Sequence, residues 1–555
     1  LSNQAIRWLT AVGASCFKDM AQETHECEIS PLLSYSGEGL GAYASRKVPL
    51  PCVLKNLVVE DLALDVCEIS ALRKVLQQTN QDHILDFFPD MTPDDKIYKQ
   101  LNDVDIPALL INLEAAKNEG VKDCNALTPP PSVLKWSETE EAKRDSMTSL
   151  GMESICRSEV GAVIMSGGQG TRLGFKGPKG MYSIGLASGK SIFQLHMERL
   201  QKMRMLAAAD TCPIDNVHIP VYIMTSITNT QTIQDYFTEM NYFNFPQEDV
   251  FFFEQGLLPC LTNDGQMILE SPEALSMAPD GNGGIFPAMK KSGAFQNMLD
   301  RNVKHLHVYG IDNVLTKSVD PGFIGFCIDN NVEVANKVVP RADASEKVGV
   351  TAVREGKMCI VEYSELPEEM TGCDSGGKLI YSAANICNHY FSVDFLHEKV
   401  MSGATSLYHL AHKKIPYYNP VTKQTETPSS PNGVKLEMFV FDVFPLAERW
   451  AVMESLREDE FAPVKNAPGS ATDSPDTARA LLSNQAIRWL TAAGASTYDC
   501  GNDFSEDGSD LRKECEISPL LSYGGEGLDH LYGAKVPLPS FFKSPHDIDD
   551  EDEQI

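Results

Sequence analysis

The chain has 555 residues, of which 43% are hydrophobic and 22% are charged, so it is long enough to divide into several domains with buried cores. Its formal net charge of −30 disfavours binding to nucleic acid or to anionic membrane surfaces, because both of these partners are themselves negative. The 14 cysteines include no C-x-x-C pair, so a zinc knuckle is not expected. No apolar run reaches the length of a membrane span, and the first residues lack the layout of a signal peptide. These features predict a cytoplasmic enzyme.

Two distant segments of the chain have nearly the same sequence. LSNQAIRWLTAVGAS at 1–15 recurs as LSNQAIRWLTAAGAS at 482–496, and ECEISPLLSYSGEGL at 26–40 recurs with one substitution at 514–528. KVPLP occurs at 47–51 and again at 535–539. Two copies so far apart do not form a solenoid. We interpret residues 1–55 as a partial duplicate of the C-terminal tail, left by a neighbouring tandem gene copy or a misjoined gene model. The alternative is a second functional module.

The rest of the chain predicts three regions. Residues 56–151 show helical spacing from 68 to 118 and then the Pro-rich connector TPPPSVLKW, which predicts a helical N-terminal domain. Residues 152–430 alternate amphipathic helical stretches with the apolar runs VGAVIM, VYIMTS, VFFFEQG and HLHVYGIDNV. This alternation is typical of buried parallel strands with crossover helices, which bind ligands beyond the carboxyl ends of the strands. Residues 431–555 predict an α+β C-terminal domain with an acidic tail, and a polar link at 421–433 precedes it.

A glycine-rich segment, SGGQGTRLGFKGPK at 166–179, follows the apolar run at 160–165. Gly167, Gly168 and Gly170 lack Cβ atoms, so successive backbone N–H groups can face a phosphate. Arg172 and Lys179 supply positive charge at the same place. The glycine spacing is one residue too long for the dinucleotide fingerprint, and GLASGKS at 185–191 is one residue too short for a Walker A loop. The segment therefore predicts a phosphate-binding loop of another kind.

This segment resembles the G-G-x-G-T-R-(L/M)-G-x(3)-P-K signature of sugar nucleotidyltransferases. Further blocks resemble the eukaryotic UDP-N-acetylhexosamine pyrophosphorylases, in that family's order: FFEQGLLP at 252–259, MAPDGNGG at 277–284, HVYGIDN at 307–313, VEYSEL at 361–366, PNGVKLEMFVFDVF at 431–444 and LREDEF at 456–461. The resemblance implies an α/β fold, namely a Rossmann-like (GT-A-like) nucleotidyltransferase core with a mixed sheet between a helical N-terminal domain and an α+β C-terminal domain.

The same resemblance implies a reaction and a set of site residues. UTP and N-acetylglucosamine 1-phosphate would react to give UDP-N-acetylglucosamine and pyrophosphate, with Mg²⁺ as cofactor. Three cations would handle the phosphates: Arg172, Lys179 and Lys435. Five residues would bind the nucleotide: Gly167, Gly168, Gly170, Gln255 and Gly281. Asn282, Glu362 and Asn385 would bind the sugar. Asp312 would hold Mg²⁺, which prefers oxygen ligands and bridges phosphates.

Some features leave alternatives open. Ser382-Ala-Ala384-Asn385 stands where the family commonly reads N-A-G-N, so the preference among GlcNAc, GalNAc and glucose is not fixed by the sequence. A uridylyltransferase of broader sugar-1-phosphate scope and a catalytically silent UDP-sugar-binding scaffold are the competing interpretations. His409 and His412 are predicted to lie on a helical stretch and to pack rather than bind metal. The sequence is compatible with a homodimer but does not determine the oligomeric state.

Overall fold

The computed structural model describes residues 69–88, 91–119, 127–209, 212–363, 365–366, 368–402, 408–499 and 514–543, and the backbone of four short strands between 15 and 54. The chain folds into two compact units, each assembled from separate stretches of sequence. The larger unit comprises Val121–Gly256, Pro279–Leu407 and Glu437–Ile555, and the smaller unit comprises Leu1–Gly120, Leu257–Ala278 and Tyr408–Leu436. The domain boundaries predicted at 55, 151 and 430 differ from the limits of these units and stay predictions.

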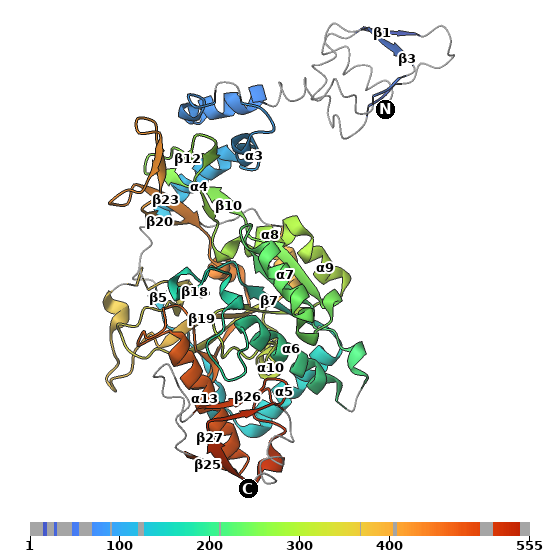
Figure 1. The fold of residues 1–555 in the computed structure, drawn as a ribbon, viewed down its shortest axis with the longest axis vertical. Helices are drawn as coiled ribbons and strands as arrows, with labels where there is room; N and C mark the ends of the chain where they lie inside the picture. The colour runs from blue at the N-terminus through green and yellow to red at the C-terminus, as the bar shows by residue number, and fades with distance from the viewer. Residues whose placement is uncertain are drawn as a thin grey trace. The chain divides into compact units, whose positions relative to one another are not determined.

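The larger unit is built around a mixed sheet of 11 strands (Figure 1). Its main path runs in the order β6 (Leu134–Lys135), β24 (Trp450–Glu454), β16 (Val334–Pro340), β19 (Ala383–Ser392), β15 (His305–Gly310), β7 (Val160–Met165), β8 (Val221–Thr225) and β9 (Val250–Glu254). Three shorter strands attach to it: β5 (Leu127–Thr128), β17 (Val350–Arg354) and β18 (Lys357–Val361). Neighbouring strands from β15 to β9 are parallel, whereas β19 is antiparallel to both β15 and β16. The apolar runs predicted as parallel strands are confirmed.

Helices cover both faces of this sheet, because the buried strands are apolar on both sides. Alternate residues of β7 join different cores: Ala162 and Ile164 lie in one, and Val163 and Met165 lie in the other. The first core also contains side chains of α5 (Glu141–Cys156), α6 (Ile192–Ala208), α7 (Thr230–Glu239) and α10 (Pro321–Asp329). The second contains side chains of α8 (Ile285–Ser292) and α9 (Ala294–Asp300). This layered arrangement is the predicted α/β core.

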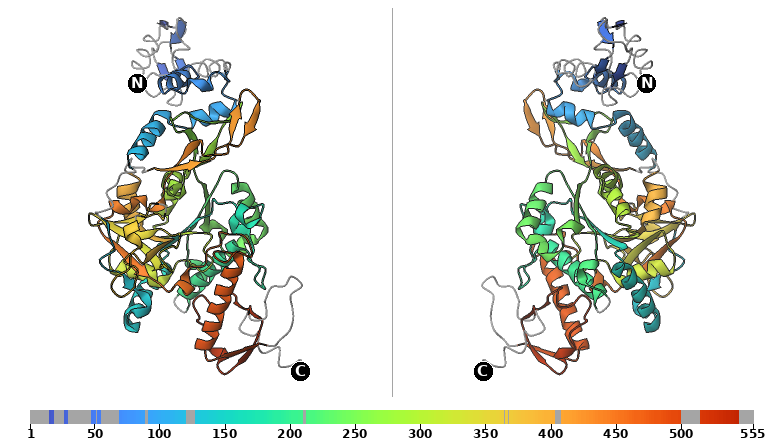
Figure 2. Two further views of the ribbon diagram at one scale, coloured as in Figure 1. Left: turned by 90° about the vertical axis from the view of Figure 1, so that its left-hand side faces the viewer. Right: turned by 90° about the vertical axis from the view of Figure 1, so that its right-hand side faces the viewer.

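The C-terminal part of the larger unit is a helix with four short strands (Figure 2). Ser474 caps α13 (Pro475–Ala492), and its side chain accepts a hydrogen bond from the N–H of Thr477. Strand β25 (Ser496–Asp499) pairs in parallel with β27 (Lys535–Leu538), and β26 (Cys515–Ile517) pairs in parallel with β28 (Ser540–Phe542). Their apolar side chains form a separate small core. The predicted α+β character of this end of the chain is therefore present.

The first copy of the repeat shows the same backbone pairing. Strand β1 (Ser15–Lys18) pairs in parallel with β3 (Lys47–Leu50), and β2 (Cys27–Ile29) pairs in parallel with β4 (Cys52–Leu54). The registers correspond residue by residue, because Ser15 lies opposite Lys47 and its counterpart Ser496 lies opposite Lys535. The repeated sequences thus encode the same supersecondary unit. The origin that we assign to residues 1–55 stays a prediction.

The smaller unit combines helices and short strands. A helix at 69–78, α3 (Lys96–Asn102) and α4 (Ile106–Glu119) confirm the helical spacing. Just before α3, the Thr92 N–H donates to the Asp95 carboxylate at 2.6 Å. Nine short strands accompany them: β10 (Leu257–Pro259), β11 (Leu261–Thr262), β12 (Leu269–Ser271), β13 (Ala274–Leu275), β14 (Met277–Pro279), β20 (His409–Lys413), β21 (Tyr417–Asn419), β22 (Gln424–Glu426) and β23 (Gly433–Glu437). Helices and strands share one core.

Two local predictions in the smaller unit were wrong. His409 and His412 lie on strand β20 and not on a helix, because this segment is the edge of a three-stranded sheet with β23 and β11. The polar link at 421–433 contains β22, which forms an antiparallel hairpin with β21. In both segments strand pairing outweighs the local sequence preference. Across the described part of the chain, we find no helix whose length and apolar character would let it cross a bilayer.

Candidate active site

The glycine-rich segment forms a tight loop at the carboxyl end of β7. Ser166 anchors its start, since its hydroxyl donates to the carbonyl of Met224 at 2.9 Å. The loop folds back on itself through hydrogen bonds from the Gly170 N–H to the Gly177 carbonyl, at 2.9 Å, and from the Lys179 N–H to the Gly168 carbonyl, at 3.2 Å. Lys179 is thereby held next to the first glycines, although it comes 11 positions after Gly168 in the sequence.

A cavity of about 310 Å³ opens at the carboxyl ends of β7, β8, β9 and β15. This size is at the lower end of the range for small-molecule sites, and the position is the usual one for ligands of α/β sheets. The wall contains seven of the residues that the sequence singled out: Gly167, Gly168, Lys179, Gln255, Asn282, Asp312 and Asn385. Residues from five separate stretches of the chain therefore converge on one cavity.

Lys179 and Asp312 form an ion pair inside this cavity. The Lys179 Nζ lies 3.4 Å from Asp312 Oδ2, and both side chains keep some exposure, 18% and 28%. Asp312 follows β15, and its carbonyl accepts a hydrogen bond from the Val464 N–H at 2.9 Å. The pair places a positive charge and a carboxylate side by side, the combination that a site for phosphates and a cation needs.

Hydrogen bonds fix the side chains of Gln255 and Asn282, which both line the cavity. The Gln255 Nε2 donates to the carbonyl of Gly281 at 2.5 Å. The Asn282 Oδ1 accepts from the N–H of Val440 at 3.0 Å. Gly281 has a φ of +91°, and a Cβ there would lie 2.2 Å from the carbonyl oxygen of Met438, so only glycine fits. These contacts tie the loop after β14 to the end of β9.

Five predicted residues do not line the cavity: Gly170, Arg172, Gly281, Glu362 and Lys435. Gly170 packs against Phe175 and uses its N–H within the loop. Arg172 lies on a short 3₁₀ turn of the loop and is exposed to solvent. Gly281 contributes only its carbonyl, which accepts the hydrogen bond from Gln255. Glu362 lies beside Gly349, since a Cβ added to Gly349 would be 2.9 Å from the Glu362 Oε1.

Lys435 lies on β23 in the smaller unit. Its role as a phosphate-binding lysine stays a prediction, as do the roles assigned to Arg172 and Glu362.

Sequence reasoning missed a second lysine of the cavity, Lys465. Its segment is fixed against the end of β15, because the Asn313 side chain donates to the carbonyl of Glu460 at 2.7 Å and accepts from the Ala462 N–H at 2.8 Å. Phe461 and Pro463 line the same wall. Lys465 lies more than 150 residues after Asp312 and follows no glycine motif, so no local pattern marked it.

Asp280 is a buried carboxylic acid behind the cavity wall, 6% exposed. Burial raises its pKa to about 7, against the opposing effect of a hydrogen bond from Gln255. In the unfolded chain this carboxyl ionises near its ordinary pKa of 3.8. The folded state therefore loses stability as the pH rises from about 4 to about 7, since only the unfolded chain ionises freely there.

We expect Asp280→Asn to remove this penalty. At pH 8 the free energy of unfolding of the variant should exceed that of the wild type by up to about 4 kcal/mol, since each pKa unit corresponds to about 1.4 kcal/mol. The variant should therefore unfold at a higher temperature at this pH. At pH 4 the two proteins should unfold at nearly the same temperature. Thermal unfolding followed by circular dichroism at both pH values measures this, and a difference of equal size at pH 4 and pH 8 would contradict the assigned pKa.

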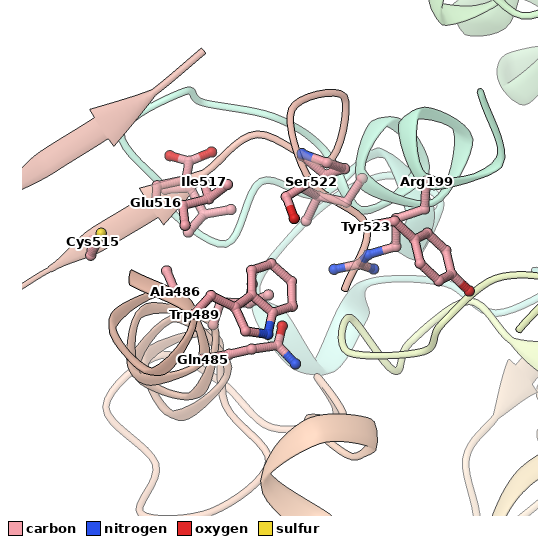
Figure 3. Close-up of a pocket in the computed structure, with 13 residues that line it drawn as sticks. Arg199, Gln485, Ala486, Trp489, Cys515, Glu516, Ile517, Ser522 and Tyr523 are labelled. Carbon is pink, nitrogen blue, oxygen red and sulfur yellow. The ribbon is translucent and has the colours of Figure 1, made fainter. Parts of the chain in front are cut away.

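A second cavity lies at the junction of α13 and β26 with α6 (Figure 3). Trp489 and Gln485 come from the helix and Glu516 from the strand, and Arg199 approaches from α6. Its volume is about 30 Å³, room for water molecules and not for a nucleotide.

Comparisons with known proteins place the chain in a family. The family model described as UTP–glucose-1-phosphate uridylyltransferase matches residues 117–492. UDP-N-acetylglucosamine diphosphorylase 1 of Arabidopsis thaliana is 39% identical over 474 residues, which cover 83% of this chain and 90% of the relative. UDP-N-acetylglucosamine pyrophosphorylase of Saccharomyces cerevisiae is 39% identical over 426 residues, 76% of this chain and 85% of the relative.

A solved structure is also similar. It is the uridine diphosphate N-acetylglucosamine pyrophosphorylase of Trypanosoma brucei in complex with an inhibitor, with a TM-score of 0.73 and 28% identity. The match covers 86% of this chain and 99% of that structure. The chain therefore belongs to the eukaryotic UDP-N-acetylhexosamine (UDP-N-acetylglucosamine) pyrophosphorylase family.

Proposed function

We propose that the chain transfers the uridylyl group of UTP to N-acetylglucosamine 1-phosphate, which gives UDP-N-acetylglucosamine and pyrophosphate. Family membership supports the reaction class. The observation that carries the proposal is the cavity itself, which is lined by Gly167 and Gly168, the Lys179–Asp312 pair, Gln255 and Asn385. Phosphate-binding, cationic and amide groups thus surround one space.

The reaction mainly requires the protein to position two anionic substrates and to stabilise the negative charge that develops on their phosphates. A phosphate oxygen of the sugar phosphate attacks the α-phosphorus of UTP, and the bond from that phosphorus to the pyrophosphate oxygen breaks. Within the described chain, the N–H groups of Gly167 and Gly168 donate no hydrogen bond to the protein, so both can donate to a phosphate. Lys179 stabilises the charge that develops on the α-phosphoryl oxygens, and Lys465 adds a second positive charge to the wall.

The residues of the cavity fit a magnesium ion held largely by the substrates. In the described part of the chain no cluster of three or more His, Cys, Asp and Glu side chains could hold a metal alone. Mg²⁺ commonly takes one or two protein carboxylates and completes its shell with phosphate oxygens and water, and Asp312 supplies one such carboxylate. When bound, the ion would neutralise phosphate charge. Asp312 also orients the Lys179 ammonium group through their ion pair.

The sugar would lie near β19, where Asn385 faces the cavity. The Asn385 N–H donates to the carbonyl of Gly349 at 2.8 Å, and its Oδ1 accepts from the Cys387 N–H at 3.2 Å, so its side chain is oriented. Ala384, which stands where the family commonly has glycine, is fully buried in a cluster with Phe461. Its methyl group packs into the protein, which supports retention of N-acetylhexosamine binding.

A uridylyltransferase of broader sugar scope is the alternative that a specific observation favours, because Ser382 stands where the family commonly has asparagine. Pyrophosphate release from UTP with GlcNAc 1-phosphate, GalNAc 1-phosphate and glucose 1-phosphate distinguishes the GlcNAc-specific enzyme from the broader one. We expect GlcNAc 1-phosphate to give the highest kcat/KM. Equal kcat/KM for all three would favour the broader enzyme. Stabilisation by UDP-N-acetylglucosamine in thermal unfolding without any turnover would instead indicate a silent binding protein.

Lys435 provides a test of the smaller unit's part in the reaction. We expect Lys435→Ala to lower kcat/KM for UTP and sugar phosphate by about 10- to 100-fold, the effect of losing one hydrogen bond to a charged group. Lys413→Ala, a change of an exposed lysine on the neighbouring strand β20, is the matched control and should leave kcat/KM near the wild-type value. An unchanged kcat/KM for Lys435→Ala would place Lys435 outside the site.

A further inference from the structure

Three charged side chains meet in the interior of the larger unit. Lys337 of β16 is fully buried, and its Nζ lies 2.6 Å from Asp320 Oδ2 and 3.0 Å from Glu460 Oε1. Burial lowers the pKa of Lys337, but the charges of the two carboxylates outweigh it and raise this pKa above its ordinary value, so the lysine is charged. Asp320 caps α10, and Glu460 is the last residue of α12 (Arg457–Glu460). One buried lysine thus joins a strand to two helices.

Stability alone does not explain the carboxylate of Glu460. Its side chain belongs to a residue that is 2% exposed, and within the described chain its Oε2 has no hydrogen-bond partner. Removing a carboxylate from water is costly, and an apolar side chain of similar size commonly serves stability as well or better. Lys337 already has a carboxylate partner in Asp320, so its charge does not require a second one. The role of Glu460 is better explained by the segment that follows it.

The segment that follows Glu460 forms one wall of the cavity. Phe461 and Lys465 both line this wall. The segment runs antiparallel to the residues after β15, and the Val464 N–H donates to the Asp312 carbonyl at 2.9 Å. The Lys465 Nζ lies 5.9 Å from the centre of the Phe461 ring, within the range of a cation–π contact. The position of the Lys465 ammonium group therefore depends on where this short segment begins.

Glu460 holds the beginning of this segment by two hydrogen bonds. Its backbone carbonyl accepts from the Asn313 side chain at 2.7 Å, and its Oε1 accepts from Lys337 at 3.0 Å. The other ion pairs of α12 in the described chain are partly exposed, and exposed pairs contribute little. The buried bond to Lys337 is therefore the side-chain contact that fixes the end of α12 next to the cavity wall.

We infer that Glu460, held by Lys337, is a positioning residue that fixes the wall segment 461–465 and so places the Lys465 ammonium group in the cavity. This inference rests on the proposed function and deepens it, because Lys465 would supply positive charge to the anionic substrates. A displacement of about 1 Å is enough to weaken such a contact strongly. Glu460 itself does not line the cavity and acts only through Lys465.

The test compares the effect of Glu460→Met on kcat/KM in the presence and in the absence of the Lys465 side chain. Methionine keeps about the volume of glutamate but offers no carboxylate to Lys337. We expect kcat/KM for UTP and N-acetylglucosamine 1-phosphate to fall about 10- to 100-fold. In the Lys465→Ala background the same change should have no further effect, because an absent ammonium group cannot be displaced.

Three outcomes of this cycle would overturn the inference. One is a fall of equal size in both backgrounds, as expected for a residue that acts independently of Lys465. The others are an unchanged kcat/KM in Glu460→Met and an unchanged kcat/KM in Lys465→Ala. Should Glu460→Met fail to fold, Glu460→Ala takes its place, since it leaves the pair of Lys337 with Asp320 intact.

Asp320→Asn is the matched control, because it removes the other carboxylate partner of Lys337 and leaves the pair with Glu460 in place. Asparagine also keeps a side-chain oxygen that can cap α10. This variant should keep kcat/KM near the wild-type value. If it lost as much activity as Glu460→Met, the cause would be the buried charge cluster in general, and the specific role of Glu460 would be refuted.

Failure of the proposed function would be visible separately. Wild-type protein that releases no pyrophosphate from UTP and N-acetylglucosamine 1-phosphate would refute the reaction. Hydrogen exchange of the Val464 amide, which donates to the Asp312 carbonyl, then tests the positioning role without turnover. Faster exchange in Glu460→Met than in both the wild type and Asp320→Asn supports the role of Glu460, and equal exchange in the wild type and Glu460→Met overturns it.

Discussion

Lys179→Ala is expected to lower kcat/KM for UTP and N-acetylglucosamine 1-phosphate by about 100- to 1,000-fold, the usual effect of removing a group that stabilises transition-state charge. The loop holds Lys179 beside Gly168, and its ammonium group lies in the cavity 3.4 Å from the Asp312 carboxylate. Much of the loss should be in kcat, because the positive charge is needed most when negative charge shifts onto the α-phosphoryl oxygens. Steady-state kinetics of pyrophosphate release measure it.

Lys176→Ala is the matched control for this prediction. Lys176 lies in the same loop, three residues earlier, but is exposed and does not line the cavity. Its loss should change kcat/KM by less than about 3-fold, since an exposed charge is screened by solvent. If the two variants lost activity to the same extent, the effect would reflect loop charge in general, and the assignment of Lys179 to the phosphates would be wrong.

Asp312→Asn is expected to have the second large effect. The change keeps the size of the side chain but removes its negative charge, so it should weaken the proposed Mg²⁺ site and release Lys179 from its ion pair. We expect kcat at saturating substrate to fall about 100-fold or more and the Mg²⁺ concentration for half-maximal activity to rise. A titration of activity against Mg²⁺ for wild type and variant separates these two effects.

Asp329→Asn serves as the control. Asp329 is an exposed aspartate at the end of α10, and its substitution removes the same charge from the larger unit. It should leave the Mg²⁺ titration unchanged. If Asp312→Asn kept both the activity and the Mg²⁺ dependence of the wild type, Asp312 would not be the residue that holds the ion.

The strands that build the site could be predicted because their sequences are apolar on both faces. VGAVIM, VYIMT and HLHVYG are short apolar runs bounded by turn residues, and they form β7, β8 and β15. The carboxyl ends of parallel strands lie at the same edge of a sheet, so the residues that follow these strands lie close together. Gly167, Gln255 and Asp312 follow three parallel strands and do converge, although the roles of Gln255 and Asp312 came from the family resemblance and not from the strand pattern.

The parts that could not be predicted depend on contacts between distant segments. Lys465 reaches the cavity because its segment is tied to Asn313, and no local motif records that hydrogen-bonded contact. The smaller unit combines residues 257–278 and 408–436 with the N-terminal helices, which periodicity along the chain does not reveal. His409 was misassigned for the same reason, since its strand forms only by pairing with β23.

A crystal structure of the full chain with UDP-N-acetylglucosamine and Mg²⁺ tests the central claim most directly. We expect the diphosphate of this product to lie within hydrogen-bond distance of the Gly168 N–H and the Lys179 Nζ, with its uracil at the Gln255 side chain and its sugar at Asn385. A product bound in any other place, with Lys179 and Asp312 still paired and out of contact with phosphate, would contradict the assignment of this cavity.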